Sequence, residues 1–260
     1  MELKDKVAVV LGASAAGGTG WAIAEALAAE GAKVVVAARR LEPLEELAKK
    51  IGGKAVVCDA GKADQIAALA HAAKDAYGQI DIAVNSAARP IIGPIADTTP
   101  TAVQKSLDVN FLGHVNFVRE TAAVMRDGGS IILISSFSAA QPVMPFFPYA
   151  CAKAATDCLV RYAAMEYGAR GIRVNSILPG PIKTDMGAHL YEVPGREEVY
   201  QREIPLKRVG LPEDFARVVI WLSKPHYITG VNIPVSGGLH LTRVPREDEM
   251  PGGNRYRNRD

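Results

Sequence analysis

Short apolar runs alternate with longer helical segments along this chain, and this alternation constrains the fold more than any other feature. The runs that we expect to be strands lie at 7–11, 34–37, 54–58, 82–84, 131–134, 172–178 and 231–235. The longer helical segments between them include 63–77, 101–125, 149–168 and 212–222. Strands joined by helices of about ten or more residues pair in parallel, with right-handed crossovers. The alternation therefore predicts an α/β fold: a single-domain, doubly wound parallel sheet of about seven strands with helices on both faces.

The composition excludes several classes of protein. Apolar residues make up 48% and charged residues 22% of the 260 residues, the balance of an ordinary globular protein rather than a disordered chain. The formal net charge of +2 predicts no broad nucleic-acid-binding surface. No apolar run approaches the about 20 residues of a membrane span, and the first residues do not resemble a secretory signal. We therefore expect neither nucleic acid nor membrane as a partner.

The spacing of cysteine and histidine adds two expectations. Cys151 and Cys158 would lie about 10 Å apart on one helix, which is too far for a disulfide. A chain without a disulfide framework is typical of the reducing cytoplasm, so we expect a cytoplasmic protein. The histidines show no spacing typical of a metal site, and we expect no metal.

The organisation along the chain predicts one domain over residues 1–240 and a C-terminal tail at 241–260. Residues 184–208 are rich in glycine, proline and charge and interrupt the alternation, which predicts a substrate lid or loop near the ligand-binding edge. The tail has many charged and few apolar residues. It is either a frayed terminus or an arm that docks on a neighbouring subunit.

A glycine-rich turn follows the first predicted strand and precedes the first helix. It reads Gly12-Ala13-Ser14-Ala15-Ala16-Gly17-Gly18-Thr19-Gly20. Glycines allow the backbone to approach a pyrophosphate, and the N-terminus of the next helix supplies amide donors and a partial positive charge. The turn therefore predicts a dinucleotide site. Asp59, after the third strand, is placed either to accept a hydrogen bond from the adenine amino group or to cap the next helix.

The end of the second predicted strand indicates which nicotinamide cofactor binds. NAD-binding proteins carry a carboxylate there, which bonds the ribose 2′-hydroxyl. This chain has Arg39 and Arg40 instead. A guanidinium fork suits a 2′-phosphate, so the pattern favours NADP(H), with NAD(H) possible. The alternative is that both arginines are ordinary solvated surface residues.

Tyr149 and Lys153 are one helical turn apart, so their side chains lie on one helix face. A tyrosine hydroxyl has a pKa of about 10, and lowering it to about 7 requires about 4 kcal/mol. One positive charge about 4 Å away supplies about that amount at an effective dielectric constant of about 20. Such a tyrosine can deprotonate an alcohol or protonate an alkoxide. Ser136, at the end of the fifth predicted strand, belongs to the same ligand-binding edge.

Taken together, these motifs resemble the short-chain dehydrogenase/reductase family over the chain up to about residue 239. Further matching motifs are Asn85-Ser86-Ala87-Ala88, Asn110, Pro179-Gly180, Ile228-Thr229-Gly230 and Val235-Ser236-Gly237-Gly238. The resemblance implies a Rossmann-type fold with Tyr149 as the general acid/base. It implies that Lys153 holds the nicotinamide ribose and lowers the pKa of Tyr149. It also implies that Ser136 orients the substrate oxygen and that Asn110 anchors a water that relays protons to Lys153.

The resemblance also implies a set of cofactor contacts. They are Gly12, Ser14, Gly18, Thr19, Gly20, Arg39, Arg40, Asp59, Ala60, Asn85, Ala87, Tyr149, Lys153, Pro179, Gly180, Ile182 and Thr184, with the last two near the carboxamide. Two motifs depart from the family pattern. Five residues separate Gly12 from Gly18 where the family has three, so we expect the turn to bulge. Asn85-Ser86-Ala87-Ala88 replaces the usual Asn-Asn-Ala-Gly.

Three functions are compatible with these residues. The first is NADP(H)-dependent interconversion of a secondary alcohol and a ketone, on a hydrophobic or cyclic substrate, because residues 143–148 are apolar and aromatic. That segment can equally be a core or subunit contact. The second function is reduction of 3-oxoacyl thioesters of acyl carrier protein. The third is a non-catalytic cofactor-binding sensor, which would not require a tyrosine proton donor. The resemblance also implies a homotetramer, or a homodimer.

Overall fold

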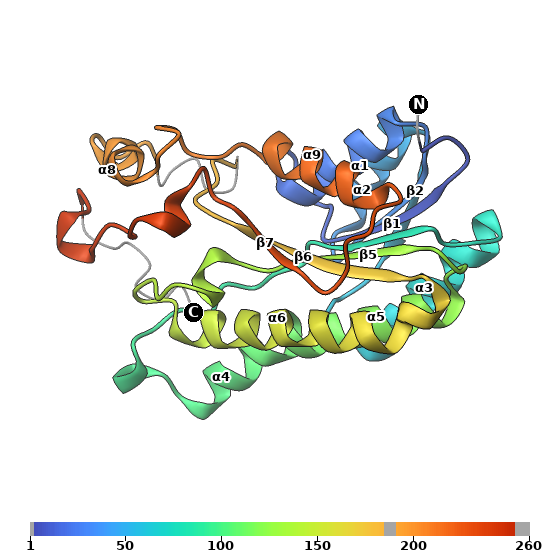
Figure 1. The fold of residues 1–260 in the computed structure, drawn as a ribbon, viewed down its shortest axis with the longest axis horizontal. Helices are drawn as coiled ribbons and strands as arrows, with labels where there is room; N and C mark the ends of the chain where they lie inside the picture. Colours follow the sequence, from blue (N-terminus) through green and yellow to red (C-terminus); the bar gives the residue numbers. More distant parts are fainter. Residues whose placement is uncertain (1–2, 185–190, 253–260) are drawn as a thin grey trace.

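The computed structural model describes residues 3–184 and 191–252 and contains one parallel sheet, in the order β3-β2-β1-β4-β5-β6-β7 (Figure 1). The strands are β1 (Val7–Leu11), β2 (Lys33–Ala38), β3 (Lys54–Val57), β4 (Ile82–Asn85), β5 (Ser130–Ile134), β6 (Arg173–Pro179) and β7 (Asn232–Val235). Val10 of β1 pairs with Val36 of β2 on one side and Val84 of β4 on the other. The predicted doubly wound α/β sheet of about seven strands is confirmed.

Helices cover both faces of this sheet (Figure 1). On one face pack α1 (Thr19–Ala29), α2 (Leu41–Ile51) and α9 (Pro212–Ser223), and on the other α3 (Ala63–Tyr77), α5 (Gly113–Val124) and α6 (Phe147–Tyr167). Because successive strand residues point to opposite faces, Val10 enters the first core and Val9 the second. Burial on both faces explains why the strands are unbroken apolar runs in the sequence.

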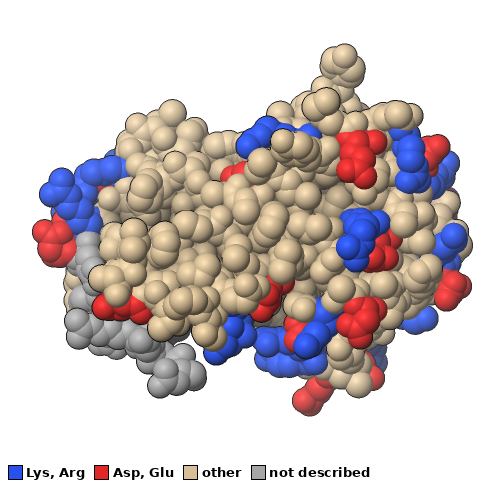
Figure 2. All heavy atoms as spheres, turned by 90° about the horizontal axis from the view of Figure 1, so that it is seen from below, with Lys and Arg blue, Asp and Glu red and all other residues tan. Residues whose placement is uncertain are grey.

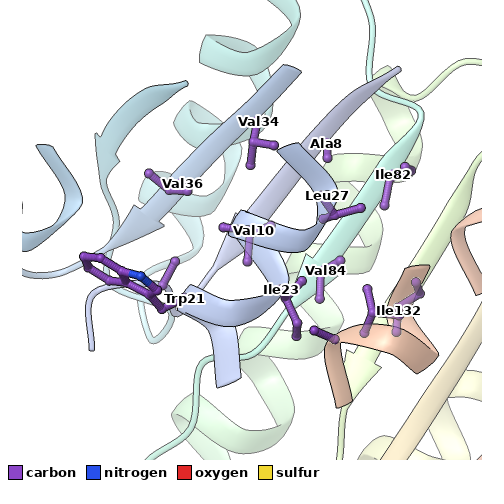
Figure 3. Packing of buried hydrophobic residues seen from close by; sticks show 14 of the residues in the cluster. Ala8, Val10, Trp21, Ile23, Leu27, Val34, Val36, Ile82, Val84 and Ile132 are labelled. Atoms are coloured by element: carbon purple, nitrogen blue, oxygen red, sulfur yellow. The ribbon is translucent and has the colours of Figure 1, made fainter. Parts of the chain in front are cut away.

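The first core shows how α1 is held on the sheet. Trp21, Ile23 and Leu27 of α1 face the valines and isoleucines of the central strands (Figure 3). Ile23 and Leu27 are fully buried, one helical turn apart. This packing fixes the N-terminus of α1 beside the carboxyl end of β1, which is where the predicted glycine-rich turn lies.

The single helix predicted over 101–125 is interrupted. α4 (Pro100–Leu107) and α5 are joined by a π-helical segment, Asp108–Leu112. The wider turn is supported from outside, because the Asn110 carbonyl oxygen accepts a hydrogen bond of 2.7 Å from Thr156 Oγ1 of α6. Gly113 follows, and a Cβ there would lie 2.3 Å from the Ala60 carbonyl oxygen. The interruption therefore follows from contacts with other segments, and such segments often occur at functional sites.

The described part of the tail, residues 241–252, contacts other segments of its own chain. Thr242 Oγ1 donates 2.7 Å to the carbonyl oxygen of Glu203, the last residue of α8 (Arg196–Glu203). The Arg243 guanidinium lies 2.8 Å from the Glu203 carboxylate, and Arg196 donates 2.9 Å to the Pro251 carbonyl oxygen. Residues 185–190 of the predicted lid and 253–260 of the tail lie outside the described residues.

The face formed by α4, α5 and α6 carries few charged side chains over its middle (Figure 2). Tyr162 and Met165 of α6 are 74% and 86% exposed. Within residues 3–184 and 191–252, no helix combines the length and apolarity that crossing a membrane requires. The same ranges hold no cluster of three or more histidine, cysteine or acidic side chains suited to a metal ion.

Candidate active site

A cleft of about 700 Å³ lies at the carboxyl edge of the sheet and spans the point between β1 and β4 where the strand order reverses. Most of the predicted site residues line it: Gly12, Ser14, Gly18, Thr19, Gly20, Arg39, Arg40, Asp59, Ala60, Ala87, Ser136, Tyr149, Pro179, Gly180, Ile182 and Thr184. Asn85, Asn110 and Lys153 do not line the cleft and are fully buried. The sheet therefore brings residues from seven different segments of the chain together in one cleft.

The glycine-rich turn forms one end of this cleft. Gly12 has a φ of +94°, and a Cβ on it would lie 2.4 Å from the backbone nitrogen of Ala87. A Cβ on Gly20 would lie 2.3 Å from the Gly12 carbonyl oxygen. The additional residues form a turn in which the Gly18 amide donates 2.9 Å to the Ala15 carbonyl oxygen, and α1 begins directly afterwards. The backbone amides at the start of α1 are thus open to an anion.

Arg39, Arg40 and Asp59 lie beside this turn with different partners. Arg40 donates 2.6 Å to the Ser14 carbonyl oxygen and so holds the turn, whereas Arg39 has no partner among the described residues. Asp59 Oδ1 accepts 2.9 Å from the Gly61 amide, but α3 is capped at Lys62, so Asp59 is not its N-cap. A carboxylate keeps further lone pairs after one such bond, and Asp59 can still accept from an adenine.

Ser136, Tyr149 and Lys153 come together where β5 ends and α6 begins. The Ser136 side chain lies close enough to the Tyr149 hydroxyl to lower its pKa, and Ser136 Oγ lies 2.9 Å from Ser138 Oγ. Lys153 Nζ lies 5.7 Å from the centroid of the Tyr149 ring. Lys153 is fully buried and donates 2.7 Å to the carbonyl oxygen of Ile134, the last residue of β5. The wall thus presents two hydroxyls to the cleft with an amine behind them.

Comparison with known proteins identifies the family. A family model described as enoyl-(acyl carrier protein) reductase matches residues 12–240. Human dehydrogenase/reductase SDR family member 4 is 35% identical over 246 residues, which cover 91% of this chain and 88% of that protein. The short chain dehydrogenase/reductase astE of Aspergillus oryzae is 35% identical, over 92% of this chain and 96% of that protein. The chain belongs to the short-chain dehydrogenase/reductase family.

Solved structures of this family superpose closely on the chain. A short-chain dehydrogenase/reductase from Mycobacterium ulcerans matches with a TM-score of 0.90 and 31% identity, over 95% of this chain and 94% of that one. A variant of actinorhodin polyketide ketoreductase with NADPH matches with a TM-score of 0.84 and 27% identity, over 92% and 98%. The protein is therefore an oxidoreductase of a family that binds NAD(P)(H) and acts on small molecules.

In the protein without a bound cofactor, burial is the main cause of the pKa shifts of Tyr149 and Lys153. Burial raises the pKa of Tyr149 to about 12, while the Ser136 hydrogen bond acts in the opposite direction. Burial lowers the pKa of Lys153 to about 7, against the attraction of Asp157. These residues alone thus do not lower the pKa of Tyr149 to the predicted value near 7. Burial removes water from both the Tyr149 phenolate and the Lys153 ammonium, and the Lys153 amine donates its hydrogen bond to Ile134.

Asn110 forms hydrogen bonds through both its side chain and its backbone carbonyl oxygen. Its side chain clamps the backbone of Arg89, with Nδ2 donating 2.8 Å to the carbonyl oxygen and Oδ1 accepting 2.9 Å from the amide. Its own carbonyl oxygen accepts from Thr156 Oγ1. That oxygen has a second lone pair, so it can still bind a water. The structure thus places Asn110 as the anchor of the loop after β4.

The backbone is also tightly packed at the carboxyl ends of β6 and β4. A Cβ on Gly180 would lie 2.9 Å from Ser236 Cα, so the chain can pass there only as glycine. Asn85 Oδ1 accepts 3.0 Å from the Ala87 amide, while Asn85 Nδ2 is buried without a partner among the described residues. A buried amide donor without a partner indicates a ligand or water at the carboxyl end of β4.

Two buried residues of the site were not identified from the sequence. Asp157 follows Lys153 by one helical turn, a spacing that could have drawn attention to it. Its pKa is raised by burial, while hydrogen bonds from Ser135 and Ser176 act in the opposite direction. His114 of α5 lies with Nε2 3.3 Å from Lys153 Nζ. A lone histidine in an apolar helix carries no signal of such a contact.

Proposed function

We propose that this protein is an NADP(H)-dependent oxidoreductase that interconverts a secondary alcohol and a ketone, with Tyr149 as the general acid/base. One observation carries the proposal. Ser136 and Tyr149 line one cleft together with the glycine-rich turn, and Ser136 lies close enough to Tyr149 to lower the pKa of its hydroxyl. Lys153 Nζ lies 5.7 Å from the centroid of the Tyr149 ring. A sensor that only bound the cofactor would need neither hydroxyl.

In ketone reduction, Ser136 donates a hydrogen bond to the carbonyl oxygen and Tyr149 transfers its proton to that oxygen as negative charge develops. A nicotinamide cofactor bound in the cleft would supply the hydride. With a pKa of about 12, Tyr149 is protonated at neutral pH and ready to act as the acid. In alcohol oxidation, Tyr149 must act as a base at neutral pH. Lowering its pKa from about 12 to about 7 requires about 7 kcal/mol. A protonated Lys153 at 5.7 Å from the ring centroid would contribute about 3 kcal/mol of that, at an effective dielectric constant of about 20.

The preference for NADP(H) is supported by the charges around the adenosine end. Arg39 lines the cleft, has no partner among the described residues and is not opposed by a carboxylate at the end of β2. Lys62 and Lys105 also line it. The similar actinorhodin polyketide ketoreductase is named with NADPH. A guanidinium free to form a bidentate contact suits the 2′-phosphate.

The Arg39→Asp variant tests this preference. Its kcat/KM with NADPH is expected to fall about 100-fold, because charge-assisted hydrogen bonds are lost and a repulsive charge is added. Its kcat/KM with NADH should change less than threefold. Arg39→Gln, which removes the cation without adding repulsion, should give an intermediate loss. Steady-state kinetics with both cofactors measure this. A wild-type preference for NADH, or an unchanged preference in Arg39→Asp, would contradict the proposal.

The substrate that we propose is hydrophobic or cyclic. Phe137, directly after Ser136, packs in a small apolar cluster with Ile204, Val209 and Leu239, which Val143 joins. Met144, in contrast, is 58% exposed. The predicted apolar segment 143–148 thus contributes partly to packing and partly to the surface near the site. A second candidate is the reduction of 3-oxoacyl thioesters. The matching family model is described as a reductase of acyl carrier protein thioesters, but of the enoyl double bond and not of the 3-oxo group.

A substrate panel tests the proposed function directly. Purified protein with NADPH should oxidise the cofactor in the presence of cyclic or aromatic ketones, followed as the loss of absorbance of the reduced nicotinamide. We expect kcat/KM for the best such ketone to exceed that for 3-oxoacyl thioesters at least tenfold. The reverse ranking would support the second candidate. Cofactor binding without turnover of any ketone or thioester would support a sensor.

We further propose that the protein is cytoplasmic and forms a homotetramer or homodimer. The exposed Tyr162 and Met165 of α6, on a face with few charges over its middle, support an interface between subunits (Figure 2). The proposed domain organisation is a single dehydrogenase domain over residues 1–240 with the tail at 241–260. The contacts of Thr242 and Arg243 with α8 support a tail that stabilises the lid.

A further inference from the structure

His114 is a buried titratable residue that the proposed mechanism does not use. It lies in the first turn of α5, four residues after Asn110, and its side chain is fully buried. Its Nε2 atom is 3.3 Å from Lys153 Nζ, although the two residues are 39 positions apart in sequence. It does not line the cleft. A polar ring at this depth, in contact with the buried lysine of the site, calls for a role at that lysine.

The contacts of Lys153 suggest what that role is. An ammonium group has three N–H donors in fixed tetrahedral directions. One donates 2.7 Å to the Ile134 carbonyl oxygen, and His114 Nε2 lies 3.3 Å from Nζ, within reach of a second. Two anchors on different elements, β5 and α5, fix the orientation of the group. The third N–H is then left for Tyr149 and the cofactor.

The protonation state of His114 allows it to accept a hydrogen bond. Burial and the nearby charge of Lys153 hold the pKa of His114 well below its usual value, against a weaker influence of the Ala87 backbone, and His114 Nδ1 is buried without a hydrogen-bond partner among the described residues. The ring is therefore neutral at neutral pH, and its Nε2 accepts a hydrogen bond when Nδ1 carries the proton. The other titratable groups that act on this pair come from α6: Tyr149 faces Lys153, and Asp157 attracts it and is itself attracted by Arg161.

We propose that His114 is a positioning residue: its neutral Nε2 accepts a hydrogen bond from Lys153 and, together with the Ile134 carbonyl oxygen, aims the ammonium at Tyr149 and the cofactor. This inference rests on the proposed function of Tyr149 and Lys153. A hydrogen bond to the ammonium favours the charged form of lysine. Removing the acceptor therefore lowers the charged fraction of Lys153, which in turn makes the phenolate of Tyr149 less favourable.

Two substitutions of similar volume test the inference by kinetics. His114→Leu removes the acceptor, and His114→Gln keeps an acceptor oxygen near the position of Nε2. We expect kcat for alcohol oxidation to fall about tenfold in His114→Leu, with substrate KM within twofold. The acid limb of its pH profile should move upward by about one unit. His114→Gln should recover kcat to within about threefold of the wild type.

The matched control is His71→Leu, because His71 is an exposed histidine of α3. It should leave kcat and the pH profile unchanged. Thermal unfolding and cofactor titration establish that each variant is folded and binds the cofactor. A folded His114→Leu variant with wild-type kcat and pH profile would overturn the inference. So would a His114→Gln variant as impaired as His114→Leu.

A second measurement does not depend on activity or on the stability of a leucine variant. Nitrogen-15 NMR of the wild-type protein, with the His114 signals assigned by comparison with His114→Gln, reports the tautomer directly. We expect the neutral Nδ1–H form from pH 6 to 9, with and without the cofactor. The Nε2–H form would mean that histidine donates to a neutral lysine amine, and it would overturn the inference. An active Tyr149→Phe enzyme would instead refute the proposed function while leaving this tautomer unchanged.

Discussion

Replacing Tyr149 with phenylalanine is expected to lower kcat about 1,000-fold, because the variant keeps the ring and loses the only group that the proposal assigns to proton transfer. The aromatic ring packs edge-on against Phe146, with centroids 6.2 Å apart, and phenylalanine retains that contact. The dissociation constant of the cofactor should therefore stay within about threefold of the wild type. Single-turnover and steady-state rates with NADPH and the best ketone of the panel measure the loss, and fluorescence titration measures cofactor binding.

The matched control for this substitution is Tyr162→Phe on the same helix. Tyr162 is 74% exposed and lies away from the cleft lining, so its variant should keep wild-type kinetics. If Tyr149→Phe turned over within tenfold of the wild type, Tyr149 would not be the general acid/base. If the wild type showed no turnover and its cofactor-dependent behaviour survived in Tyr149→Phe, the protein would be a sensor.

Replacing Lys153 with methionine is expected to abolish turnover and at the same time to stabilise the protein. Lys153 is fully buried, and burial lowers its pKa from 10.5 to about 7. This shift of about 3.5 pKa units lowers the free energy of unfolding by about 5 kcal/mol in acidic and neutral solution. Methionine has a similar length and no charge, so the variant avoids this loss. We expect the free energy of unfolding at pH 7 to rise by a few kcal/mol.

The pH dependence of this effect has a definite sign. Between the folded pKa of about 7 and the unfolded value of 10.5, the unfolded chain binds more protons at Lys153 than the folded one. The stability of the wild type therefore rises with pH through this window, by about 2 kcal/mol from pH 7 to 9. The advantage of Lys153→Met should shrink by the same amount. Urea unfolding of both proteins at the two pH values measures this difference.

Lys74→Met serves as the control, because Lys74 is an exposed lysine in the last turn of α3. It should show no stability gain that depends on pH. A Lys153→Met variant less stable than the wild type at pH 7, or an advantage constant from pH 7 to 9, would show that the buried amine does not destabilise the fold. The expected outcome would mean that Lys153 is required for catalysis and at the same time lowers the stability of the fold.

The alternation of apolar runs and helices was sufficient to predict the sheet, because burial on both faces leaves a local pattern that can be read without contacts. The same pattern placed Gly12, Ser136 and Tyr149 after strands or at a helix start, and the parallel topology collects such positions at one edge. Their convergence in one cleft was therefore predictable from the order of the motifs. The family comparison agrees with that prediction.

Other properties depended on contacts between distant segments. The break in the helix expected over 101–125 follows from Thr156 of α6, and the pairing of His114 with Lys153 joins two helices that only the folded core brings together. The ionisation of Tyr149 was expected to follow its neighbouring charge, but it follows burial, which no spacing in the sequence reports. Sequence periodicity by itself determined which faces are buried and which edge holds the site. Only the tertiary structure decided how deeply each charge lies and what it touches, because desolvation and long-range hydrogen bonds are properties of packing in three dimensions.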